Sequence, residues 1–161
     1  MPTIDAPVAT AQMLIRKPIA DVFNAIIDPS VTSHFWFTRS SGPLQVGKTV
    51  RWDWEMYGVG TDVEVRSIEP NKRIFYDWNG PDQPTSVEWI FESQGADRTF
   101  VRVKSSGFHG DANAVVREAI GSASGFSTVL AGMKAFLEHG IELNLIADHD
   151  PASLAEIPTS R

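Results

Sequence analysis

The longest periodic pattern in the chain is a helical repeat of apolar residues over Ala112–Gly140. Gly140 follows the last periodic residue, as glycine commonly does at the end of a helix. A helix of this length would extend about 43 Å, enough to cross a small domain. Its apolar positions are Val115, Ile120, Phe126, Val129, Leu130, Met133, Phe136 and Leu137.

The middle of this predicted helix, Gly121–Gly125, consists only of small residues. Each glycine disfavours a helix by about 1 kcal/mol relative to alanine, so helix propensity does not explain the run. Two explanations remain: another backbone packs closely here, or the helix is thinned beside an open space.

Upstream of this helix, the pattern predicts one strand and two short helices. Residues Thr10–Lys17 alternate between two faces, as in a strand. Pro18 then stands at the first position of a predicted helix that has one apolar face. Pro29 ends this helix. A second short helix is expected over Ser30–Trp36.

Five further segments alternate apolar and polar residues and are separated by short turns. This pattern is typical of an antiparallel meander with one face toward solvent. The order of elements predicts an α+β fold, in which a curved antiparallel β-sheet grips a long C-terminal α-helix. The five segments are Thr49–Met56, Thr61–Ile68, Arg73–Trp78, the stretch around 87–91, and Thr99–Ser105.

The 161-residue length fits one domain with a real core. We assign residues 1–8 to a lead-in and 9–147 to the domain. Residues 148–161 are polar and contain proline, so we expect a mobile tail there.

Composition excludes several classes of function. A net charge of -6 with scattered Lys and Arg argues against nucleic-acid binding. The absence of cysteine excludes disulfides, thiolate catalysis and cysteine-ligated zinc. The chain starts without a signal-peptide pattern, and no stretch approaches the ~18 consecutive apolar residues of a membrane span. We therefore expect a cytoplasmic protein without a membrane span.

One face of the predicted sheet carries a set of large apolar side chains. They could simply fill the core against the helix, or some of them could line a concave apolar pocket. The run of small residues opposite them favours a cavity. The set consists of Trp52, Trp54, Met56, Tyr76, Trp78, Trp89 and Phe91.

No catalytic or metal-binding motif stands out. The histidines lack the i, i+4 spacing of a helical zinc site, and neither a metal nor a cofactor is predicted. Only His34, before an aromatic cluster, and His109, in a glycine-flanked loop, are expected near the ends of the cavity. There they could polarise a carbonyl as acid–base groups, or they could be ordinary surface histidines.

Five short motifs spread along the chain carry a family resemblance: Pro18, Val22-Phe23, Trp36-Phe37, Gly107-Phe108 and Gly125-Phe126. With these residues the sequence resembles the START-like (SRPBCC) superfamily with the helix-grip fold. Within it, the chain is most similar to the bacterial family named after the activator of the heat-shock-protein ATPase. The resemblance covers roughly residues 9–140 and implies a cavity for apolar small molecules, as in lipid-transfer proteins and polyketide cyclases.

These observations predict a protein that binds a hydrophobic small molecule, either a lipid or a polyketide-like compound. The alternatives are a cyclase-like enzyme, for which the sequence shows no catalytic set, and a protein-interaction module. A chaperone partner is implied by the resemblance alone, and a homodimer through the outer sheet face is left open. The predicted ligand-binding residues are Trp36, Trp52, Trp54, Met56, Tyr76, Trp78, Trp89, Phe91, Phe108, Phe126, Leu130 and Met133.

Overall fold

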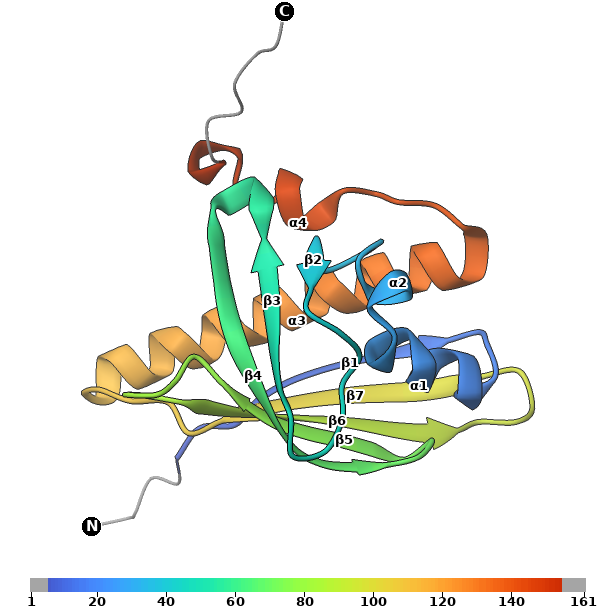
Figure 1. Ribbon diagram of the computed structural model, residues 1–161, viewed down its shortest axis with the longest axis horizontal. Helices are drawn as coiled ribbons and strands as arrows, with labels where there is room; N and C mark the ends of the chain where they lie inside the picture. Colours follow the sequence, from blue (N-terminus) through green and yellow to red (C-terminus); the bar gives the residue numbers. More distant parts are fainter. Residues whose placement is uncertain (1–5, 155–161) are drawn as a thin grey trace, which may run out of the picture.

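The computed structural model describes residues 6–154 and contains one antiparallel sheet with a long helix across it (Figure 1). Seven strands follow the order β1-β7-β6-β5-β4-β3-β2. This arrangement confirms the predicted α+β fold. The strands are β1 (Ala9–Ile15), β2 (Arg39–Ser40), β3 (Thr49–Trp54), β4 (Val59–Glu69), β5 (Arg73–Trp78), β6 (Thr85–Ser93) and β7 (Thr99–Ser106).

The helices match the predicted order and add a C-terminal feature. The two short helices after β1 are α1 (Ile19–Ile27) and α2 (Pro29–Thr32), and α2 is shorter than expected. The long helix is α3 (Ala112–His139), with Gly140 in the left-handed conformation at its end. Two further turns follow, α4 (Leu145–Asp148) and η2 (Pro151–Ser153). Among residues 6–154, no helix is long and apolar enough to cross a bilayer.

Three segments differ from the sequence prediction. The strand predicted over Thr49–Met56 ends at Trp54, and a 3₁₀ turn, η1 (Glu55–Tyr57), follows it. Strand β2, of two residues, is not among the strands predicted from the sequence. Residues 148–154, predicted as the start of a tail, include η2, and the remainder of the predicted tail lies outside the described residues.

The core lies between the sheet and the second half of α3. Phe126, Val129, Leu130 and Met133 are buried there, whereas Ile120, one and a half turns earlier, is 66% exposed. The apolar face predicted for the helix is therefore buried only from Phe126 onward. The first half of α3 projects past the core and leaves space beneath it.

The last turn of α3 is tied to the end of β1 by a hydrogen-bonded carboxylate. Glu138 Oε2 accepts from the Arg16 amide at 2.9 Å and from Lys134 Nζ at 2.6 Å, and Lys134 also donates to the Leu14 carbonyl. Burial by itself raises the pKa of Glu138, but these hydrogen bonds and the charges of Lys134 and His139 outweigh it, so the pKa is lowered. The ionised form of Glu138 therefore stabilises the fold.

We expect Glu138→Gln to reduce the free energy of unfolding by about 1 kcal/mol at neutral pH, because the charged acceptor is lost. A lowered folded-state pKa gives a contribution that is complete above the ordinary value of 4.5 and is lost as pH falls through the folded value. The difference between wild type and variant should therefore shrink in acid. Urea denaturation at several pH values measures this difference in the free energy of unfolding. The control is Glu69→Gln, because Glu69 is exposed. A difference independent of pH would contradict this account.

Candidate ligand-binding cavity

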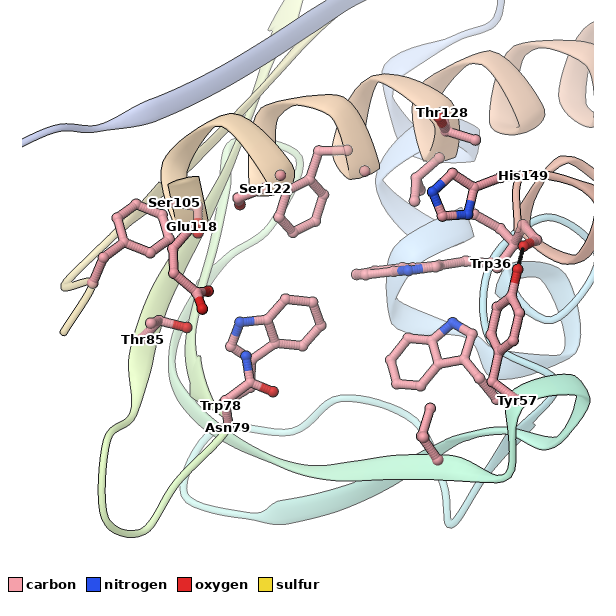
Figure 2. A pocket seen from close by; sticks show the side chains of 18 residues that line it. Trp36, Tyr57, Trp78, Asn79, Thr85, Ser105, Glu118, Ser122, Thr128 and His149 are labelled. Carbon is pink, nitrogen blue, oxygen red and sulfur yellow. Dashed lines mark hydrogen bonds between the residues drawn. The ribbon is translucent and has the colours of Figure 1, made fainter. Parts of the chain in front are cut away.

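A cavity of about 440 Å³ lies under the middle of α3, between that helix, the ends of the central strands and the α4 segment (Figure 2). Of its eighteen lining residues, six are Phe, Tyr or Trp and seven are polar. The aromatic lining consists of Trp36, Trp54, Tyr57, Trp78, Phe108 and Phe126. The polar lining consists of Asn79, Thr85, Ser105, Glu118, Ser122, Thr128 and His149.

The helix forms the roof of the cavity with its smallest residues. Gly121, Ser122 and Gly125 all line it. A Cβ atom added at Gly121 or Gly125 would find no other atom within 4 Å, apart from its chain neighbours and the local helix backbone. The cavity thus lies where the sequence indicated a thinned helix, and these residues keep it open.

Trp36 forms the boundary between the cavity and the packed core. Trp36 comes shortly after α2 in the chain, and it is 6% exposed. Its ring centroid lies 4.9 Å from that of Trp52 in the core and 6.1 Å from that of Trp54, both in edge-to-face geometry. It also contacts Trp78 and Phe126 in the same way, at 5.9 and 5.8 Å. Edge-to-face pairs of this kind fix ring orientation, so the wall of the cavity is well defined.

Five of the predicted ligand-binding residues line the cavity: Trp36, Trp54, Trp78, Phe108 and Phe126. Six others are buried in the core and do not line it. Among these, the Trp89 indole Nε1 donates to the Tyr76 hydroxyl at 3.2 Å, which satisfies the polar atoms of both rings. Burial raises the pKa of Tyr76 far above its ordinary value, so this hydroxyl stays protonated. The six are Trp52, Tyr76, Trp89, Phe91, Leu130 and Met133.

Met56 lies elsewhere because the chain leaves the strand before reaching it. The η1 turn shifts the alternation, and Gly58 closes the turn with φ of 64°. Met56 therefore faces a second, smaller hollow of about 110 Å³. Tyr57, and not Met56, lines the main cavity. The Tyr57 hydroxyl donates to the carbonyl of Ile146 and lies 3.3 Å from the carbonyl oxygen of Ala147.

The structure places neither predicted histidine on the main cavity. His34 lines the smaller hollow, stacks on Phe136 with ring centroids 4.4 Å apart, and pairs with Glu142. His109 Nε2 bonds to the Pro84 carbonyl at 2.9 Å. Both side chains have structural partners, and the acid–base role considered from the sequence has no geometric support here.

None of the seven polar residues on the cavity was among the predicted ligand-binding residues, and two of the seven, Glu118 and His149, are titratable. His149 was assigned to a tail because its surroundings are polar, yet α4 and the contact from Tyr57 bring it to the cavity. Glu118 lies one turn before Ser122 on the same helical face, a spacing that could have indicated its position. In Figure 2 the two lie at opposite ends, with Trp36 and Trp78 between them.

The sequence profile described as "Activator of Hsp90 ATPase homolog 1-like protein" matches residues 16–138. The chain belongs to this family. The match confirms the resemblance to the START-like superfamily inferred from the sequence. Among curated proteins, no sequence matches this AHSA1-like chain.

Solved structures share the fold of this AHSA1-like chain. Protein SSP2350 from Staphylococcus saprophyticus is 26% identical, with a TM-score of 0.73 over 85% of this chain and 96% of that one. The Aha1 dimer from Colwellia psychrerythraea is 22% identical, with a TM-score of 0.71 over 83% and 98%. The di-domain ARO/CYC BexL from the BE-7585A biosynthetic pathway is 16% identical, with a TM-score of 0.69 over 82% and 46%.

We expect Gly121→Ala and Gly125→Ala each to raise the free energy of unfolding by about 0.5–1 kcal/mol, because alanine favours a helix and the new methyl group meets no atom. Gly132→Ala on the same helix is the matched control, since its Cβ would lie 3.4 Å from both Cβ and O of Phe35. Chemical denaturation measures all three. If the three substitutions raised the free energy of unfolding equally, the explanation from free space around Gly121 and Gly125 would be wrong.

Proposed function

We propose that this AHSA1-like protein binds an aromatic, largely apolar small molecule in the cavity beneath α3. The observation that carries the proposal is a cavity of about 440 Å³ lined by six aromatic side chains and roofed by glycines. Ligand sites in proteins are commonly cavities of ~300–1,000 Å³ with apolar walls and a few polar groups.

A defect in packing does not account for this space. Protein interiors are close-packed, and voids larger than a water molecule are few. Here the space coincides with two helical glycines, each of which lowers helix stability by about 1 kcal/mol relative to alanine. Residues that reduce stability and keep a cavity open are expected where the cavity has a use.

The shape of the cavity supports a flat ligand with polar groups near its ends. The α3 residues that line it run from Glu118 to Val129, and the ten-residue step from Glu118 to Thr128 corresponds to about 15 Å. In Figure 2, Glu118 and Thr85 lie at one end of the cavity and His149 and Thr128 at the other, with Trp36 and Trp78 between them. Ring systems gain about 0.5–1.5 kcal/mol for each well-oriented aromatic pair beyond the burial of their surface.

Turnover of a polyketide-like substrate is the second candidate. It is favoured by the likeness of the fold to the ARO/CYC BexL and by two titratable side chains, Glu118 and His149, on the cavity. A carboxylate and an imidazole could exchange protons with a bound carbonyl compound. Product formation that is lost in Glu118→Gln or His149→Gln would support this candidate.

A third candidate function is the activation of a chaperone ATPase. Its support is the description of the family to which the chain belongs.

A thermal-shift screen with neutral polycyclic aromatics, flavonoids, steroids and lipids tests the proposal. A ligand at a hundred times its Kd should stabilise the fold by ~2.7 kcal/mol, which raises Tm by several degrees at this size. We expect Gly125→Leu to abolish the shift by filling the cavity. Ser124→Leu adds the same side chain one position away, where the residue does not line the cavity, and should keep the shift.

A hit that is equally strong in wild type and Gly125→Leu would place binding elsewhere and contradict the proposal. A screen without hits across these classes would favour a protein-interaction role. In that case, capture of a purified chaperone by the full chain becomes the next measurement.

A further inference from the structure

We propose that Glu118 selects the ligand by its charge. In this proposal, which rests on the function proposed above, the ligand is an aromatic molecule whose polar group donates hydrogen bonds. A protonated amine is preferred over a hydroxyl, and a carboxylate is disfavoured. The selecting feature is one carboxylate at the end of an aromatic cavity.

The Glu118 side chain is available to a ligand. It projects from the second turn of α3, and Figure 2 shows its carboxylate directed into the cavity between Thr85 and Trp78. Within residues 6–154, no hydrogen bond or ion pair engages this carboxylate. By contrast, Asp77 and Glu88 on the sheet pair with Arg66 and Arg73.

At the Glu118 end of the cavity, the described lining residues include no cationic side chain. Among the described lining residues none is lysine or arginine, and the nearby polar groups are the neutral side chains of Thr85, Ser105 and Ser122. An anionic group placed at this end would meet a like charge without gaining a cationic partner. The net charge of -6 acts in the same direction over longer distances.

The tryptophans of the cavity add a second preference for positive charge. Trp36, Trp54 and Trp78 all line it, and the face of a tryptophan ring attracts a cation within about 6 Å of its centroid. Trp78 and Glu118 line the same cavity, so an ammonium group bound at the carboxylate would also lie among aromatic rings. A hydroxyl would satisfy the carboxylate alone.

This combination distinguishes among the classes of apolar ligand. Long-chain fatty acids and other carboxylates are disfavoured by Glu118, although the walls are apolar. Aromatic amines and phenols share the hydrogen-bond donor that the carboxylate requires. Aromatic amines and phenols differ in charge, and a matched series of probes distinguishes between them.

The test uses three naphthalenes that differ in one group: naphthalen-2-ylmethylamine, naphthalen-2-ylmethanol and naphthalene-2-carboxylate. Each is titrated into the full chain at pH 8. We expect affinity in the order amine, alcohol, acid, with the amine about fivefold or more tighter than the acid. Added NaCl should weaken binding of the amine and leave the alcohol unchanged.

In Glu118→Gln, which keeps the size of the side chain, the amine and the acid should bind within about twofold of each other, because only the weaker preference from the tryptophan faces and the net charge is left. Glu69→Gln removes a negative charge away from the cavity and should keep the wild-type order.

An acid that binds as tightly as the amine, or an order unchanged by Glu118→Gln, would overturn this inference. The proposed function would then stand if Gly125→Leu still blocks the alcohol. Failure of all three probes to bind would instead overturn both proposals.

Discussion

The structure depends on the burial of one half of one helix. From Phe126 onward, α3 packs its apolar side chains onto the sheet, and its end is fixed to β1 through Glu138 and Lys134. Burial of large apolar side chains at about 1.5–3 kcal/mol each makes this the main attachment of the helix to the rest of the fold. Because the helix is rigid and continuous, the first half is carried along and extends over the sheet without filling the space below it.

That space persists because its lower wall is also rigid. Trp36 is held by edge-to-face contacts with Trp52 on the core side and Trp54 on the cavity side. Phe37 stacks on Trp52 at 4.8 Å and fixes the backbone that carries Trp36. A collapse of α3 onto the sheet would require these rings to move together, so the aromatic cluster supports the cavity as well as the core.

The sequence predicts the fold well and the site only in part, for a physical reason. Periodicity reports which face of an element is buried, so the strands and α3 could be predicted. Periodicity does not report whether a buried face meets other side chains or an empty space. Trp52 and Trp54 therefore look alike in the sequence, although Trp52 lies in the core and Trp54 lines the cavity. The η1 turn interrupts the alternation at Met56, and the position of His149 depends on a contact 89 residues apart in the chain, between Tyr57 and Ile146.

The contact from Tyr57 also has a consequence for how such a protein could diversify. One end of the cavity is built by Ile146 and His149, which follow the long helix and are not part of the sheet, although Ile146 packs against the edge of the core. Substitutions, insertions or a different path in this connecting segment would reshape that end while leaving the packed part of the domain intact. A single scaffold could in this way acquire new ligand preferences at little cost to folding, by exchanging the piece of chain that closes one side of its cavity.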